Sequence, residues 1–233
     1  MALFGLGSSK PPKPDPARDE RLAAAVYEAA CSYVDEGGGR IRVEDLISAL
    51  AAVAGETCLA AAGQVKVAAH DYAPGSLVFS DKVNQLLCGD ARAWDQVPAG
   101  SVFGAIRQGA LAAGYPADAF PALEAVFQVL PQGLGAAPWG FVPLSTDAAH
   151  IPRQMPLRAA FELRERVGAI WAEAPVSNHP TQSALAMLKA LVAVREAIDA
   201  GTVLRLALET INGMAKTAPF NAAHFAQMET DAK

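Results

Sequence analysis

The sequence predicts an all-α protein, a multi-helix bundle of about eight helices with a proline-rich extended segment crossing its middle. The composition supports this prediction, because 52% of the residues are hydrophobic but only 7% are aromatic, so Ala, Leu and Val must fill the core. Alanine loses no side-chain entropy in a helix and lets neighbouring helices approach closely. Apolar residues also recur at helical spacing along most of the chain. Five prolines between positions 131 and 156 interrupt that pattern.

The chain divides into four regions by composition. Residues 1–17 contain four prolines together with Gly, Ser and Lys, a mixture that cannot bury enough surface to fold, so we predict a flexible tail. Residues 18–137 form an N-terminal helical region, and residues 138–156 form an extended, packed connector. Residues 157–233 form a C-terminal helical region, which we expect to join 18–137 in one compact domain.

The first helix is predicted from about residue 17 to residue 35. Asp15 is a suitable N-cap, Pro16 suits the first turn, and the three glycines at 37–39 end the helix. A second helix begins near Val43, and its buried stripe repeats at helical spacing. The stripe consists of Val43, Leu46, Ile47, Leu50 and Val53.

Gly55 is expected to break or bend this second helix, because glycine is a poor helix former. The small residues of 58–69 then continue as a helix. An alternative is a short hairpin, because 64–67 alternates polar and apolar residues and 77–79 could pair with it. The dipeptide at 74–75, Pro-Gly, marks a turn in either case.

Three shorter helices are predicted before the middle of the chain. Ser80, Ser101 and Asp118 are their expected N-caps, because each side chain can accept a hydrogen bond from the first helical turn. Gly89 and Gly114 end the first two of these helices. The third carries a continuous apolar face made of Phe120, Leu123, Phe127 and Leu130.

The proline-rich stretch from 131 to 156 cannot form a long helix. Its apolar residues are nevertheless too numerous for a free linker, so we predict an ordered crossing that packs on the helices. These apolar residues are Trp139, Phe141, Val142, Leu144 and Ile151.

Three further helices are predicted in the C-terminal region, at about 157–173, 181–200 and 202–216. Gly201 ends the second of them, and Thr202 is the expected N-cap of the third. Apolar residues surround much of this last helix, which implies burial on several sides, either inside the domain or against a partner chain. They are Val203, Leu204, Leu206, Leu208, Ile211 and Met214.

Residues that can carry chemistry gather between positions 56 and 90, where Cys58, His70, Asp71 and Cys88 occur. A metal site needs three or four converging ligands, and His70 with Asp71 are the candidates for it. A nucleophilic site would pair Cys58, near a helix start, with His70 as its base. Cys88 is less suited, because the negative end of a helix dipole raises the pKa of a thiol. The competing interpretation is that both cysteines pack in the core.

Charge and hydrophobicity exclude several function classes. A net charge of −5 and a pI of about 5.4 argue against nucleic-acid binding, which needs clustered Lys and Arg. We expect no membrane association, because no apolar run reaches the roughly 18 residues of a membrane span. Three cysteines, an odd number, indicate reduced thiols, so we expect a cytoplasmic protein. No cofactor-binding motif occurs, and we predict no cofactor.

Three hypotheses about function follow. The leading one is a soluble helical protein without a catalytic motif that acts by binding other proteins or further copies of itself, as a homo-oligomer. The alternative is a metal- or small-molecule-dependent enzyme with a site around His70 and Asp71. The third is a carrier of apolar ligands, with a pocket between helices lined by Trp139, Phe141 and Trp171.

Overall fold

The computed structural model describes residues 15–63, 73–133, 135 and 141–231 of the chain. These residues form helices joined by turns, and no strand occurs among them, which confirms the predicted all-α bundle. The described α-helices are α1 (Pro16–Val34), α2 (Val43–Ala61), α3 (Asp81–Cys88), α4 (Val102–Ala112), α5 (Leu123–Gln132), α6 (Pro156–Ile170), α7 (His179–Val194), α8 (Ala200–Met214) and α9 (Ala222–Asp231). The described 3-10 helices are η1 (Trp94–Gln96), η2 (Ala117–Ala119), η3 (Ala148–His150) and η4 (Val176–Asn178).

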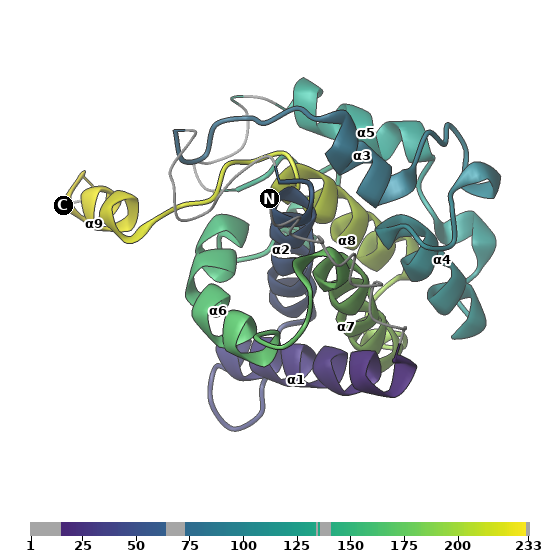
Figure 1. Cartoon of the computed structure of the whole chain (residues 1–233), viewed down its shortest axis with the longest axis horizontal. Helices are drawn as coiled ribbons and strands as arrows, with labels where there is room; N and C mark the ends of the chain where they lie inside the picture. Colours follow the sequence, from purple (N-terminus) through teal and green to yellow (C-terminus); the bar gives the residue numbers. More distant parts are fainter. Residues whose placement is uncertain (1–14, 64–72, 134, 136–140, 232–233) are drawn as a thin grey trace, which may run out of the picture.

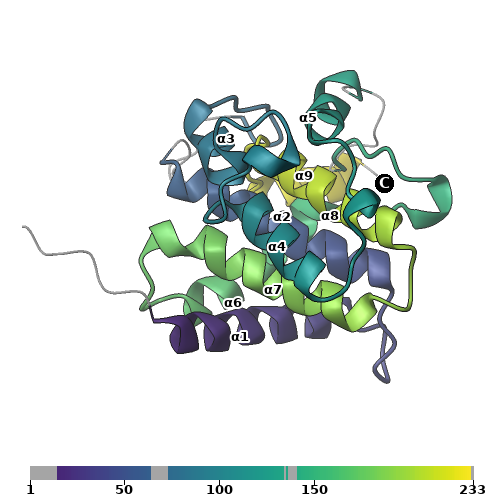
Figure 2. The ribbon, with the colours of Figure 1, turned by 90° about the vertical axis from the view of Figure 1, so that its right-hand side faces the viewer.

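Helix α2 lies at the centre of the bundle, with α6, α7 and α8 packed around it (Figure 1). α1 packs on α6 and α7, and Figure 2 shows it along the edge opposite α3 and α5. α4 packs on α7, and α5 packs on α8. Helices from both ends of the sequence therefore contribute to one hydrophobic core, which includes Val26 of α1 and Leu208 of α8.

The start of α1 and the turn that follows it were both predictable from local sequence. The predicted N-cap is confirmed, because Asp15 Oδ1 accepts a hydrogen bond of 3.1 Å from the backbone N–H of Arg18. After α1, Asp35 Oδ1 accepts hydrogen bonds from the N–H groups of Gly37 (2.9 Å) and Gly39 (3.1 Å). All three glycines of this turn have positive φ, a conformation that favours glycine.

The predicted break of the second helix at Gly55 is wrong, because α2 continues without interruption from Val43 to Ala61. Gly55 instead marks a place where α2 approaches α8 closely. A Cβ atom at position 55 would lie 2.6 Å from Met214 Cβ and 2.7 Å from the backbone nitrogen of Ala215. The glycine is therefore required by helix packing, a constraint that propensity does not reveal.

The alternative hairpin with 64–67 falls on residues outside the described part of the chain. Leu77 pairs with Thr217 in an isolated antiparallel bridge, and the hairpin stays a prediction. The N–H of Val78 donates a hydrogen bond of 2.8 Å to the carbonyl of Lys216, and the N–H of Gly75 donates one of 2.8 Å to the carbonyl of Ala218. The chain after α8 is thus held against the segment that leads into α3.

The N-caps of the next three helices follow the prediction only in part. Ser101 caps α4 as predicted, since its Oγ accepts a hydrogen bond of 3.2 Å from the N–H of Gly104. Ser80 occupies the N-cap position of α3, but its side chain makes no capping hydrogen bond. Asp118 lies in η2 and caps nothing, because Phe120 is extended (ψ 128°) and α5 begins later. Pro121 directly follows Phe120 and disfavours the helical conformation there.

The predicted extended connector is present in its described part, 141–155, which contains only η3 as regular structure. Pro131 does not begin it, because this proline lies within the last turn of α5. The connector packs on α8 as predicted, since Val142 is buried and would lie only 2.8 Å from a Cβ atom placed on Gly213. Trp139 lies outside the described residues.

Buried carboxylates fasten the connector to the helices. Asp45, in the first turn of α2, accepts backbone hydrogen bonds from Arg153 (2.7 Å) and Gln154 (3.2 Å). Glu209 of α8 accepts hydrogen bonds from the N–H (2.7 Å) and the hydroxyl (2.5 Å) of Ser145. Burial raises the pKa of Glu209, and the Ser145 hydrogen bonds oppose that increase. These contacts explain why acidic side chains occupy the interior here.

Helix α8 begins earlier than predicted, because Asp199 rather than Thr202 is the N-cap and accepts a hydrogen bond of 2.8 Å from the N–H of Thr202. The apolar residues that surround α8 are buried against α2 and α5 of the same chain, so they need no partner chain to cover them.

No described helix has both the length and the apolar content to cross a bilayer.

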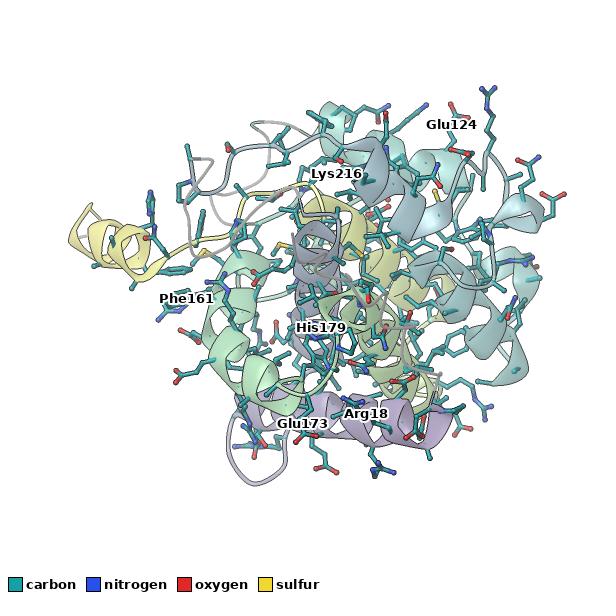
Figure 3. All side chains as sticks on the ribbon, viewed as in Figure 1. Arg18, Glu124, Phe161, Glu173, His179 and Lys216 are labelled. Atoms are coloured by element: carbon teal, nitrogen blue, oxygen red, sulfur yellow. The ribbon has the colours of Figure 1, made fainter. Side chains whose placement is uncertain are left out.

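Helix α9 was not predicted from the sequence. It lies apart from the bundle at the end of an extended segment (Figure 1), and Phe225 at its start contacts Phe161 of α6 with ring centroids 4.8 Å apart. Arg18 of α1 donates a hydrogen bond to the carbonyl of Glu173, just after α6, and both residues are labelled in Figure 3.

Candidate ligand-binding cavity between helices α2, α6 and α7

Of the residues predicted to carry chemistry, the structure places Cys58 and Cys88, whereas His70 and Asp71 lie outside the described residues. Cys58 has no exposed surface in α2, and burial raises the pKa of its thiol to about 12. Cys88, the last residue of α3, is also buried, and burial raises its pKa as well. Both environments are those of packing thiols, because a protonated buried thiol is a weak nucleophile.

Within the described ranges, no three His, Cys, Asp or Glu side chains are grouped in a way that could hold a metal ion. Because His70 and Asp71 lie outside those ranges, the metal or enzyme site predicted around them stays a prediction.

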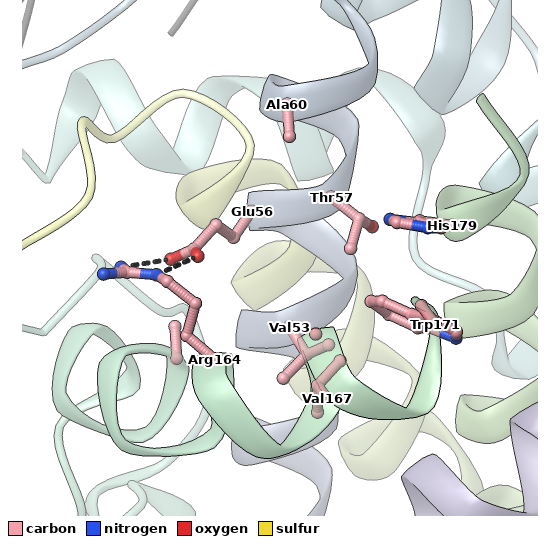
Figure 4. A pocket seen from close by; sticks show the side chains of 10 residues that line it. Val53, Glu56, Thr57, Ala60, Arg164, Val167, Trp171 and His179 are labelled. Carbon is pink, nitrogen blue, oxygen red and sulfur yellow. Dashed lines mark hydrogen bonds and ion pairs between the residues drawn. The ribbon is translucent and has the colours of Figure 1, made fainter. Parts of the chain in front are cut away.

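The structure instead shows a cavity of about 200 Å³ between α2 and α6, beside the start of α7 (Figure 4). Four residues of α2 and four of α6 line it, together with the residue that follows α6 and the residue that begins α7. They are Val53, Glu56, Thr57 and Ala60 of α2, Ala160, Arg164, Val167 and Gly168 of α6, and Trp171 and His179.

Helical spacing explains why these side chains line one space. The four α2 positions follow the spacing i, i+3, i+4, i+7, and the four α6 positions follow i, i+4, i+7, i+8, so each set lies on one helix face. The space between the two faces exists because Ala60, Ala160 and Gly168 are small. At Gly168 the space is open, since a Cβ atom placed there would meet no atom within 4 Å.

An ion pair forms one side of the cavity. Arg164 Nε lies 2.7 Å from Glu56 Oε1 and Arg164 Nη2 lies 2.9 Å from Glu56 Oε2, the bidentate arrangement drawn in Figure 4. Arg164 Nη1 also donates a hydrogen bond of 3.0 Å to the carbonyl of Phe220. The guanidinium charge is therefore neutralised by Glu56, and the pair connects α2, α6 and the segment after α8.

Two stacked rings form the other side. The rings of Trp171 and His179 lie 4.6 Å apart between centroids, with 22° between their planes. Trp171 is 4% exposed, so the stack is part of the core as well as of the cavity wall. Burial lowers the pKa of His179, although hydrogen bonds to the carbonyls of Ala174 and Trp171 oppose the decrease. The imidazole at this wall is therefore neutral at neutral pH.

One hydroxyl lies between these two sides. Thr57 Oγ1 donates a hydrogen bond of 2.8 Å to the carbonyl of Ala54 and lies 3.2 Å from Ser183 Oγ. Ser183 Oγ in turn donates one of 2.8 Å to the carbonyl of His179. A hydroxyl oxygen has two lone pairs, so Thr57 can still accept a hydrogen bond from a bound molecule.

Among the residues that line the cavity, one had been predicted from the sequence to line a pocket. Trp171, predicted to line a pocket between helices, does line the cavity, whereas Phe141 is not among the lining residues and Trp139 lies outside the described ones. The Glu56–Arg164 pair joins positions 108 residues apart, and no local pattern signals a pairing at that separation. The helical spacing of small residues on α2 and α6 was visible, but the sequence does not say that these two faces meet.

Comparison of the chain with protein-family models, with curated protein sequences and with solved structures gives no match in any of the three.

Proposed function

We propose that the protein binds a small, neutral, largely apolar molecule in the cavity between α2, α6 and α7. The observation that carries this proposal is the cavity wall, in which apolar side chains and the Trp171–His179 stack surround a space that small residues leave open. Ligand sites in proteins are typically concave and mostly apolar, with a few polar groups that orient the ligand.

The size of the cavity limits the ligand. An apolar cavity of about 150 Å³ is enough to bind benzene. The 200 Å³ available here therefore suits one aromatic or alicyclic ring with small substituents, or a compact pair of fused rings. The flat stacked wall formed by Trp171 and His179 favours a planar ring.

The electrostatics of the cavity favour a neutral ligand. Arg164 is already paired with Glu56, so neither charge is left for an ionic group of the ligand. His179 is kept neutral by burial. A charged ligand would lose hydration on entering and find no opposite charge among the lining residues. The Thr57 hydroxyl remains as a hydrogen-bond acceptor, which suits a ligand with a single N–H or O–H group.

The test is a binding titration with indole, a neutral planar molecule with one N–H group, followed by isothermal calorimetry or by chemical shifts of the protein. Ala160→Leu places a larger side chain in the cavity, while Ala169→Leu adds the same side chain at an exposed position of the same helix. We expect indole to bind the wild type and Ala169→Leu equally, and Ala160→Leu at least about tenfold more weakly. Indole-3-acetate, which adds a carboxylate, should bind more weakly than indole.

Two results would contradict the proposal. One is unchanged indole affinity in Ala160→Leu, provided that circular dichroism and thermal unfolding show this variant to be folded. The other is the absence of binding to the wild type by indole and by further neutral ring compounds of similar size. Native mass spectrometry of the freshly purified protein adds an independent readout, because a tightly held ligand would appear as a mass increase that Ala160→Leu loses.

Protein binding and self-association stay a prediction. The apolar coverage of α8, on which that prediction depended, is accounted for by burial within the chain. Light scattering over a range of protein concentrations tests it directly, since a monomer at all concentrations would contradict self-association.

A further inference from the structure

The cavity between α2, α6 and α7 has two chemically different sides (Figure 4). Trp171 and His179 form an aromatic wall on one side, and Glu56 and Arg164 form an ion pair on the other. The pair as a whole carries no net charge, but charged groups make the strongest hydrogen bonds. The polar part of a ligand is therefore selected on this side of the cavity.

Arg164 keeps hydrogen-bond donors that the protein does not use. A guanidinium carries five N–H groups. Two of them bond to the carboxylate of Glu56, from Nε and Nη2, and one on Nη1 bonds to the carbonyl of Phe220. The ring of Phe161 lies over the guanidinium, with its centre 5.5 Å from Cζ, so it covers a face and not the N–H edge. Within the described part of the chain, one N–H on Nη1 and one on Nη2 are left without an acceptor.

Glu56 keeps acceptors next to these donors. Each carboxylate oxygen has two lone pairs, and each accepts one hydrogen bond from Arg164. Glu56 lies on the cavity face of α2 between Val53 and Ala60. Its side chain is only 13% exposed, and that of Arg164 is 27% exposed. Hydrogen bonds to such covered groups are stronger than hydrogen bonds at an open surface.

A donor and an acceptor side by side on a neutral pair select the polar group of the ligand. A carboxylate could accept a hydrogen bond from Arg164 but would be repelled by Glu56, and an ammonium group would meet the opposite conflict. A ketone or an ester offers an acceptor only. A carboxamide is neutral and planar, and it offers both an N–H donor and a carbonyl acceptor.

We propose that the cavity selects an aromatic carboxamide, with its ring against the Trp171–His179 stack and its amide group at the Glu56–Arg164 pair. The amide carbonyl accepts a hydrogen bond from Arg164, and the amide N–H donates one to Glu56. This specificity rests on the proposed function, because it names the class of neutral ring compound that the cavity binds. The volume of 200 Å³ is sufficient for one ring with an amide substituent.

Isothermal calorimetry with benzamide and acetophenone tests this specificity. The two molecules have nearly the same shape, but acetophenone has a methyl group in place of the amide NH₂, so it keeps the acceptor and lacks the donor. A purely apolar cavity would favour acetophenone, because burial of an unpaired amide is costly. We expect benzamide to bind the wild type at least about fivefold more tightly than acetophenone, and benzoate to bind more weakly than either.

Matched variants test whether the ion pair causes the preference. Arg164→Lys keeps the positive charge and removes the Nη donors, so the ratio of benzamide to acetophenone affinity should fall by at least about half. Glu56→Gln replaces one acceptor oxygen with an NH₂ group and should reduce the same ratio. Arg153→Lys makes the lysine change in the exposed pair with Glu36 and should leave the ratio unchanged. The ratio is the readout, because a general disturbance of the cavity weakens both ligands, and circular dichroism establishes that each variant is folded.

Indole separates the failure of this proposal from the failure of the proposed function. If indole binds the wild type but benzamide binds no better than acetophenone, the amide specificity is overturned and the proposed function stands. If neither indole nor the three substituted benzenes bind, both are overturned. A benzamide preference that stays the same in Arg164→Lys and Glu56→Gln would also overturn the proposal, because the ion pair would then have no part in it.

Discussion

Gly55 of α2 and Met214 of α8 lie so close that a Cβ atom on Gly55 would be 2.6 Å from Met214 Cβ. This contact sets the distance between the two helices at the centre of the bundle. The residues that follow Gly55, Glu56 and Thr57, lie on the wall of the cavity beside α6. The same turn of α2 therefore contributes both to the central helix packing and to the candidate site.

Gly55→Ala is expected to destabilise the protein by about 2 kcal/mol or more, because two of the atoms in the way, Ile211 O in α8 and Ala215 N just after it, belong to the backbone and cannot rotate aside. Gly168→Ala is the matched control, since Gly168 is also helical but has open space around it. That substitution should stabilise by about 0.5–1 kcal/mol through helix propensity. Urea unfolding measures both values, and the same sign for the two variants would contradict this account.

Glu56→Gln is expected to cost about 1–2 kcal/mol of stability, because it leaves the largely covered Arg164 guanidinium without its charge partner. Glu36→Gln makes the same chemical change in the exposed pair with Arg153, where the two side chains are 52% and 68% exposed. The exposed pair should contribute less than about 0.5 kcal/mol. Unfolding free energies of the two variants at equal salt concentration provide the comparison, and equal losses would show that burial of the Glu56 pair has no effect.

Acidification should weaken the fold through His179. Because burial lowers the folded-state pKa of His179 below its ordinary 6.5, the unfolded chain binds the proton more readily as the pH falls below that value. The free energy of unfolding therefore decreases between pH 7.5 and pH 5. His179→Phe keeps a ring against Trp171 but cannot titrate, so its stability should depend less on pH over this range. Denaturation at both pH values measures the slopes, and identical slopes would exclude a contribution from His179.

Lys216→Met is expected to stabilise the protein at pH 7 by about 2 kcal/mol, since removal of a buried charge outweighs the lost hydrogen bond to Asn212. The folded-state pKa of Lys216 is about 8 and the ordinary value is 10.5, so the unfolded state binds more protons between these values. Wild-type stability should therefore rise from pH 8 to pH 10.5, and the advantage of Lys216→Met should shrink. Lys82→Met, at an exposed position, should show neither effect. If Lys216→Met were more stable than the wild type by the same amount at every pH, the lowered pKa of Lys216 would be contradicted.

Helix ends were predictable from the sequence where interactions between residues close in the chain determine them. The caps at Asp15 and Ser101 follow from side chains that can accept hydrogen bonds from the first helical turn. Predictions failed where a neighbour or a distant helix decided the outcome. Pro121 delays the start of α5 beyond Asp118, and α8 makes Gly55 a packing residue rather than a helix breaker.

For the candidate site, the sequence pointed to Trp171 but not to the residues opposite it. Arg164 looks like one more arginine on an amphipathic helix until Glu56 of α2 is placed against it. Lys216 likewise follows a helix in a way that suggests an exposed cation, and only the packing of Phe127 and Asn212 around it reveals its burial.

The sequence by itself determined that this protein is a helical bundle, because helix propensity and the spacing of apolar residues act within a few turns of one chain segment. The tertiary structure alone decided which helix faces meet, and so where space remains between α2 and α6 and where a lysine is buried beneath Phe127. The reason is physical: an apolar stripe is complementary to many others, and the choice among them depends on the fit of side chains far apart in the sequence.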